Sequence, residues 1–158
     1  MYRKPDFIVG PPTDPYLLRW WIIPRNTWAN VYLHEFLRSD DDRALHDHPW
    51  HSLSIVLSGG YWEHRPNGSR TWYGPGSILW RGATYTHMIE LPEKDGKPLP
   101  CRTLFLTGPT VRVWGFHCPQ GWKPWFKFVN RDEPGSIGPG CDDSKPFSQR
   151  PITGSEGS

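Results

Sequence analysis

Turn-forming residues divide this chain into short segments, and this feature restricts its fold more than any other. Glycine contributes 16 and proline 18 of the 158 residues, and they gather in the runs GG, PNGS and GPGS between positions 59 and 77. The segments between the turns are rich in Val, Ile, Trp, Tyr and Phe, which favour strands. The Asn-Gly pair at 67–68 is typical of a tight hairpin turn. The sequence therefore predicts an all-β sandwich or barrel.

The predicted strands all lie within the first 133 residues, at 17–23, 30–38, 52–57, 61–65, 70–73, 78–80, 81–91, 101–108, 111–118 and 125–129. We expect a single domain over residues 1–133, because domains most often have about 100–150 residues. Residues 1–15 are rich in Pro and Gly and are predicted to form an extended arm. Residues 134–158 are rich in Gly, Ser and Pro, with few apolar residues, so a disordered tail is expected there.

The charge and cysteine content argue against several classes of protein. The net charge is +2 and 22% of residues are charged, so no basic surface for nucleic acid or anionic lipid is expected. The apolar run LLRWWIIP at 17–24 is too short to cross a bilayer, and the first residues lack the apolar core of a secretion signal. Cys101, Cys118 and Cys141 are far apart and odd in number, so a disulfide framework is not expected. We predict a cytoplasmic protein that binds neither nucleic acid nor membrane.

Three histidines, His46, His48 and His51, lie within six positions directly before an apolar predicted strand. Side chains two residues apart on a strand share a face, so His46 and His48 could bind one ion. His87 follows a second group of glycine turns and is the candidate for a third ligand. Three imidazoles leave coordination positions open, as a catalytic metal site requires. In the alternative interpretation, these histidines are polar strand-end residues that bond to the backbone.

The motif HDH before an apolar strand and a glycine, with PGS...RG....H further along the chain, resembles the two motifs of the cupin superfamily. His46 and His48 match the histidine pair of the first motif and Gly59 or Gly60 its closing glycine, while the second motif is matched by Gly76, Gly82 and His87. The resemblance covers about residues 30–118. It implies a small double-stranded β-helix, a jelly-roll barrel of two packed sheets with the metal inside.

The sequence departs from the superfamily pattern at two places. The first motif has a glutamate four or five residues after its second histidine, where this chain has Ser52 and Leu53. His51 is one position too early, and Pro49 could introduce a bend that turns it inward. A four-histidine site and a three-histidine site with His51 facing solvent are therefore both open. Arg81 occupies a position where the second motif usually has proline.

Four further residues are candidates for the substrate pocket. Tyr61 and Glu63 share a strand face beside the first motif, although Glu63 could equally be a solvent-facing charge. His117 is predicted either to point into the barrel or to be a hydrogen-bonded core histidine. Arg112 could orient an anionic substrate or lie in solvent. Aromatic side chains could form the remaining wall, because ligand pockets are mainly apolar with few polar groups.

In cupins with histidine-only sites, the resemblance implies oxidation of a small organic molecule by dioxygen at ferrous iron. The first hypothesis is therefore a mononuclear metal-dependent oxygenase that binds one divalent transition metal. Fe(II) is the expected ion, and Zn, Ni, Mn and Cu are the alternatives. The second is an isomerase or epimerase acting on a sugar or sugar phosphate, with histidine as general base. The third is a non-catalytic module that binds a small ligand. A homodimer formed through edge strands, with arm 1–23 crossing the interface, is also expected.

Overall fold

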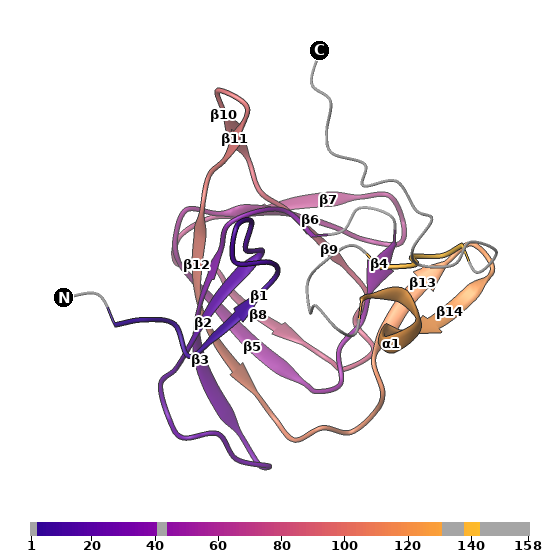
Figure 1. Cartoon of the computed structure of the whole chain (residues 1–158), viewed down its shortest axis with the longest axis horizontal. Helices are drawn as coiled ribbons and strands as arrows, with labels where there is room; N and C mark the ends of the chain where they lie inside the picture. The colour runs from indigo at the N-terminus through magenta and orange to yellow at the C-terminus, as the bar shows by residue number, and fades with distance from the viewer. Residues whose placement is uncertain (1–2, 41–43, 131–137, 143–158) are drawn as a thin grey trace.

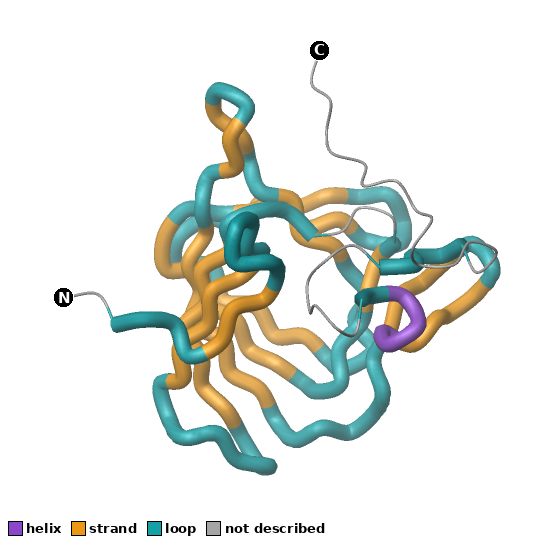
Figure 2. The backbone as a smooth tube through the Cα atoms, in the orientation of Figure 1, coloured by secondary structure: helices purple, strands orange, loops and turns teal. Residues whose placement is uncertain are grey.

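The computed structural model describes residues 3–40, 44–130 and 138–142. Strands make up nearly all of its regular structure (Figure 2). The all-β prediction is therefore confirmed. Within the described residues, no helix is long and apolar enough to span a membrane.

Two walls of antiparallel sheet face each other (Figure 1). The first wall is one six-stranded sheet in the order β1 (Phe7–Val9), β2 (Leu17–Trp21), β3 (Asn30–Phe36), β12 (Cys101–Thr107), β5 (Ser52–Ser58) and β8 (Ile78–Arg81). The second wall combines the sheet β7 (Arg70–Tyr73), β6 (Tyr61–His64), β9 (Met88–Glu90) with the sheet β14 (Gly121–Pro124), β13 (Gly115–Cys118), β4 (Leu45–His46). A bridge between His46 and His87 joins these two smaller sheets. The hairpin β10 (Glu93–Lys94) and β11 (Lys97–Pro98) projects from the body.

The main core lies between the two walls. Side chains along β5 alternate, so that Ser52, Ser54 and Val56 are buried on the inner face. Val56 and Cys101 from the first wall pack against Tyr61 and other apolar residues of the second wall. The alternation places every second side chain of each strand in the interior, which is where polar groups of a functional site must also point.

The hairpin predicted around Asn-Gly is present as β6 and β7. The preceding glycine pair closes β5 because the backbone approaches another segment too closely for a side chain. Gly59 has a φ of 72°, and a Cβ at this position would lie 2.3 Å from the carbonyl oxygen of Pro100. Only glycine fits this crossing without displacing the chain.

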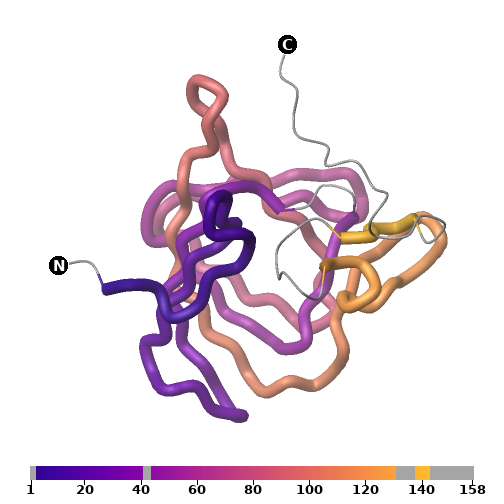
Figure 3. The backbone as a smooth tube through the Cα atoms, viewed as in Figure 1, coloured from indigo at the N-terminus to yellow at the C-terminus, as the bar shows by residue number. Residues whose placement is uncertain are grey.

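The N-terminal residues do not form a separate arm. β1 pairs with β2, and β2 pairs with β3 of the same chain. The violet strand β3 in turn lies beside β12, which is far from it in sequence (Figure 3). The strand predicted at 17–23 is confirmed as β2, and β1 and β8 are the edges of the first wall. Pairing of two copies through such an edge stays a prediction.

Residues 125–129, predicted as a strand, form instead the one-turn helix α1 (Trp125–Phe128). Proline at 124 favours this turn, because it fixes a φ suited to the start of a helix and donates no hydrogen bond. The turn places Trp125 and Phe128 on one side. Phe128 is fully buried and stacks on Phe116, with ring centroids 3.6 Å apart.

The expectation that no disulfide forms is wrong. Cys118, at the end of β13, is bonded to Cys141. Gly140 also accepts a hydrogen bond from the buried Lys123 ammonium, at 2.7 Å. Residues 138–142 of the predicted tail therefore pack against the second wall, while most of that tail lies outside the described residues. Sequence spacing alone does not reveal this pairing, because the partner lies within a polar, glycine-rich stretch.

We predict that removing this disulfide destabilises the domain. Its two cysteines are 23 residues apart, and closing a loop of this length stabilises a fold by about 3 kcal/mol in the chain-entropy account. The double substitution Cys118→Ser, Cys141→Ser should lower the free energy of unfolding by this order in urea denaturation. A reductant should shift the midpoint of the parent protein but not of the double variant. Equal midpoints for the oxidised parent and the variant would contradict the prediction.

Candidate metal centre

The backbone brings three of the predicted histidines together. His46 ends β4, and its N–H and carbonyl group both bond to those of His87, at 2.9 and 3.0 Å. Residues paired directly across an antiparallel bridge share a face. His48 follows two positions later and is fixed by a bond from its N–H to the carbonyl group of Ala83, at 3.1 Å. The loop 82–87 and the segment 46–48 thus present their imidazoles to the same interior space.

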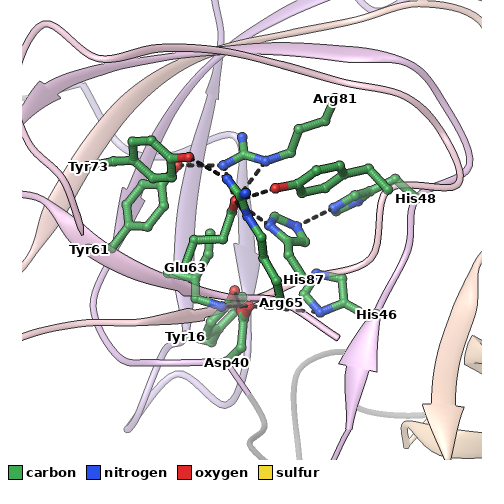
Figure 4. A network of polar contacts seen from close by, with 12 residues as sticks. Tyr16, Asp40, His46, His48, Tyr61, Glu63, Arg65, Tyr73, Arg81 and His87 are labelled. Atoms are coloured by element: carbon green, nitrogen blue, oxygen red, sulfur yellow. Dashed lines mark hydrogen bonds and ion pairs between the residues drawn. The ribbon is translucent and has the colours of Figure 1, made fainter. Parts of the chain in front are cut away.

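The three imidazoles could hold one metal ion. One nitrogen of each ring lies within 4.8 Å of the corresponding nitrogen of the others. The Nε2 atoms of His48 and His87 are 2.8 Å apart (Figure 4). Two nitrogens bound at right angles to an ion at 2.0–2.1 Å lie about 3 Å apart, so this spacing fits adjacent coordination positions. Three ligands from one side leave the opposite side of an ion open.

The second nitrogen of two of these rings faces a carboxylate. The Nδ1 atom of His87 lies 2.8 Å from Oε2 of Glu63, and the Nδ1 atom of His46 lies 3.8 Å from Asp40. A carboxylate can only accept, so the proton of His87 is on Nδ1 and the lone pair is on Nε2. Such outer partners orient metal ligands and raise their basicity.

Glu63 is fully buried, and it joins the two walls. Its carboxylate accepts hydrogen bonds from the guanidinium of Arg81, with Nε at 2.8 Å, and from the hydroxyl of Tyr85 at 2.6 Å. Arg81 also donates to the hydroxyl of Tyr61, at 3.0 Å. Burial alone would raise the pKa of Glu63, but the bond to His87 and the charge of Arg81 lower it to about 2. The carboxylate is therefore ionised and paired.

Asp40 makes the corresponding contact on the other side of the histidines. Tyr16 donates a hydrogen bond from its hydroxyl to one carboxylate oxygen, and the N–H of Ile89 donates to the other at 2.6 Å. The sequence did not single out either Asp40 or Tyr16. Asp40 belongs to the acidic run SDDDR, which is typical of a solvated turn, and its partner is 24 residues away.

The neutral form of the histidines is favoured by their surroundings. Burial lowers the pKa of His46 to about 4, although the charge of Asp40 opposes this. Burial, together with His46 and His87, holds the pKa of His48 well below its usual range. Neutral imidazoles are the form that binds metal, so these two ligands need no deprotonation near pH 7.

No protein-family model matches this chain, and no curated protein matches it. Solved structures do. A Klebsiella pneumoniae protein with a double-stranded β-helix domain aligns with a TM-score of 0.50 and 19% identity, over 69% of this chain and 90% of the other. A candidate mannose-6-phosphate isomerase from Ralstonia eutropha aligns with a TM-score of 0.50 and 17% identity, over 66% and 93%. A cupin superfamily protein of Desulfitobacterium hafniense aligns with a TM-score of 0.46 and 12% identity, over 69% and 84%.

The chain has the double-stranded β-helix fold. This confirms the architecture that the two sequence motifs imply. In this β-helix His46 enters from the end of β4, His48 from the segment that follows it and His87 from the loop before β9.

His51 does not join the other three histidines of this β-helix. Its side chain is exposed, and its ring is parallel to that of Trp80, with centroids 6.2 Å apart. Trp80 points outward from β8, since it is 69% exposed. Of the two alternatives left open by the sequence, the structure has the one in which His51 faces solvent.

His117 and Arg112 lie in a different cluster. In β13 it is Phe116 that pairs with His46, so His117 points to the opposite face. The interpretation that His117 points into the barrel is therefore wrong. The strand begins only at Gly115, so the face of His117 is set by the pairing of β13 with β4 and not by alternation from Val111 and Val113. His117 and Arg112 both contact the buried carboxylate of Asp47, at 3.1 and 2.7 Å.

We predict that acidification destabilises the metal-free protein. The pKa of His46 is about 4 in the folded chain against 6.5 for an ordinary histidine, so the unfolded chain takes up a proton first. The contribution to stability is complete above pH 6.5 and is lost as the pH falls toward 4. The free energy of unfolding should fall by about 2 kcal/mol between pH 7 and pH 5, and by less in His46→Gln. Equal pH dependence in both proteins would refute this assignment.

Glu63→Gln should impair both stability and metal binding. Arg81, which is 4% exposed, would lose its charged partner, and breaking a buried pair in this way costs about 3–5 kcal/mol. Loss of an outer partner of a ligand typically weakens metal binding by about 10- to 100-fold. Urea denaturation and titration with Zn²⁺ measure the two effects. Glu90→Gln is the matched control, because Glu90 is 40% exposed, and its loss should change stability by less than about 1 kcal/mol.

Proposed function

We propose that this protein is a mononuclear metal-dependent oxygenase, which binds ferrous iron through His46, His48 and His87 and acts on a small organic molecule. The observation that carries this proposal is the composition of the ligand set. Three imidazoles converge, two of them kept neutral by burial, while the nearest carboxylates contact their outer nitrogens instead. Imidazole ligands suit iron, zinc, nickel and copper alike.

The charge balance around the site supports this reaction class. Glu63 is neutralised by Arg81, with which it forms a buried ion pair. Three neutral imidazoles leave the charge of a bound dication uncompensated, which favours anionic or oxygen-derived ligands at the open positions. When bound, ferrous iron supplies the redox chemistry by which dioxygen is activated.

The protein's own groups would hold and orient the reacting components. Glu63 accepts a hydrogen bond from Nδ1 of His87. This keeps the Nε2 atom of His87 directed at the point where the three histidine nitrogens converge. Tyr85 donates to the same carboxylate, and burial with this contact raises the pKa of Tyr85 to about 12. Its hydroxyl therefore stays protonated at neutral pH and serves as a hydrogen-bond donor near the site.

The proposal is tested by loading the protein, purified without a chelating tag, with Fe(II) under anaerobic conditions. We expect about one iron atom per chain, on the basis of the single histidine group. Oxygen consumption should require both the iron and one member of a panel of small organic acids and aromatic compounds. His46→Gln and His87→Gln should abolish iron retention, whereas His51→Gln is the matched control and should retain it.

The alternatives give different results in the same experiment. Retained metal with no oxygen uptake, but with exchange of solvent protons into a sugar phosphate, would replace the oxygenase by an isomerase. Retained metal that raises thermal stability without any turnover would identify a binding module. Absence of stoichiometric binding for iron, zinc, nickel, manganese and copper would refute the metal site itself.

A further inference from the structure

The inner face of the first wall carries one polar row between two apolar rows. Arg19 of β2 pairs in register with His34 of β3, and His34 pairs with Thr103 of β12. Directly paired residues of neighbouring antiparallel strands share a face, so these three side chains form a continuous row. The two flanking rows on the same face consist of Leu17, Phe36 and Cys101 on one side and of Trp21, Tyr32 and Phe105 on the other.

Within the described residues, the guanidinium of Arg19 has no counter-charge. Its Nε donates to Nε2 of His34 at 2.8 Å, and its guanidinium lies over the ring of Tyr32, 4.8 Å from the centroid. No carboxylate among the described residues pairs with it. Burial lowers the pKa of Arg19, which shows that its charge is partly removed from water. A cation in such surroundings is costly unless an anion compensates it.

Three other arginines differ from Arg19 in having a carboxylate partner. Arg81 is paired with Glu63, Arg102 with Glu35 on the outer face, and Arg112 with Asp47. In Arg19 the Nε atom is bonded to His34, and within the described residues the two terminal nitrogens remain as free donors. A guanidinium presents such donors in a planar fork that matches a carboxylate or a phosphate.

Thr103 provides a second, independent observation. It is 1% exposed, and its hydroxyl has no hydrogen-bond partner within the described part of the chain. Buried polar atoms nearly always have a partner, and each exception requires an explanation. The hydroxyl belongs to the same row as Arg19, with His34 between them, and it faces the interior. It is therefore a second donor for a ligand that extends along this row.

The polar row belongs to the wall that faces the histidines. Tyr16 directly precedes β2, the strand that carries Arg19. Its hydroxyl bonds to Asp40, and Asp40 lies 3.8 Å from His46. Figure 4 shows Tyr16 and Asp40 directly beside His46. Arg19 and the three histidines therefore point toward the interior from opposite walls.

We propose that Arg19, with Thr103, binds the oxyanion group of the substrate, a carboxylate or a phosphate, while the rest of the substrate extends toward the histidines. The aromatic side chains of the flanking rows would enclose an apolar or flat body, because pockets combine apolar walls with a few directed polar groups. That the other end of the substrate reacts at the histidines rests on the proposed function, but the oxyanion subsite does not require a metal.

Calorimetric titration of the full-length protein tests this subsite, in metal-free and Zn²⁺-loaded forms. The probes are benzoate, phenyl phosphate and the neutral analogue benzamide. Benzoate or phenyl phosphate should bind to the metal-free protein, and benzamide should not. Arg19→Gln should weaken the anion by about 10- to 100-fold, since hydrogen bonds to charged groups have this magnitude. Arg102→Gln, which removes an arginine from the outer face, is the matched control and should leave binding unchanged.

Thr103→Val provides a second variant, in case the replacement of Arg19 disturbs folding. It keeps the shape and removes only the unpartnered hydroxyl, so stability without a ligand should be equal or higher. Binding of the preferred anion should still weaken, by about 2- to 10-fold. A purely structural role for the row would give the opposite pattern, with lower stability and no change in anion binding.

The outcomes separate the subsite from the metal centre. A preference for benzoate over phenyl phosphate identifies a carboxylate substrate, and the reverse identifies a phosphate ester. If neither anion binds better than benzamide, or if both variants bind as the parent does, the subsite is refuted even when metal is retained. If the protein retains no metal but still binds the anion through Arg19, the oxyanion subsite is supported and the oxygenase is refuted.

Discussion

One fully buried carboxylate couples the fold to the site. Glu63 lies on β6 of the second wall, accepts hydrogen bonds from Arg81 of the first wall and contacts the outer nitrogen of His87. An unpaired charge at this depth would cost several kcal/mol, so the interior is stable only while these partners stay in register. The packing of the two walls and the orientation of His87 therefore depend on the same interaction.

This carboxylate also explains how the chain departs from the motif that it otherwise resembles. The resemblance implies a glutamate ligand at position 52 or 53. Position 52 holds a serine that is buried on the inner face and pairs in register with Arg81. The carboxylate comes instead from the next strand and reaches the histidine from behind. The consequence is electrostatic, because an anionic ligand is replaced by an outer ion pair of zero net charge. A dication bound by these histidines would therefore keep more positive charge than one at a site with a glutamate ligand.

The sequence predicts features that depend on local periodicity and misses those that depend on distant contacts. Strand alternation predicts that His46 and His48 share a face, and their imidazoles do converge, although β4 ends at His46 and a backbone bond to Ala83 fixes His48. The position of His87 after the glycine turns also matches the prediction, because it pairs with His46. The segment WFKFV at 125–129, with four apolar residues and Lys127, fits a strand and a helical turn equally well, so tertiary packing decided between them. Asp40 was missed because its role comes from partners far away in sequence, which no short pattern contains.

The interior has two ends that differ in the groups they offer an anion, and this asymmetry follows from the order of the strands. The second wall contributes the histidines, whose carboxylate neighbours Glu63 and Asp40 are already engaged by other donors. The first wall contributes Arg19, which among the described residues has a neutral histidine as its side-chain hydrogen-bond partner. An anionic ligand gains the most binding energy at the guanidinium, because the described protein groups leave the positive charge of Arg19 uncompensated. A substrate with an oxyanion at one end would therefore enter in a single orientation, which leaves its opposite end to the histidines.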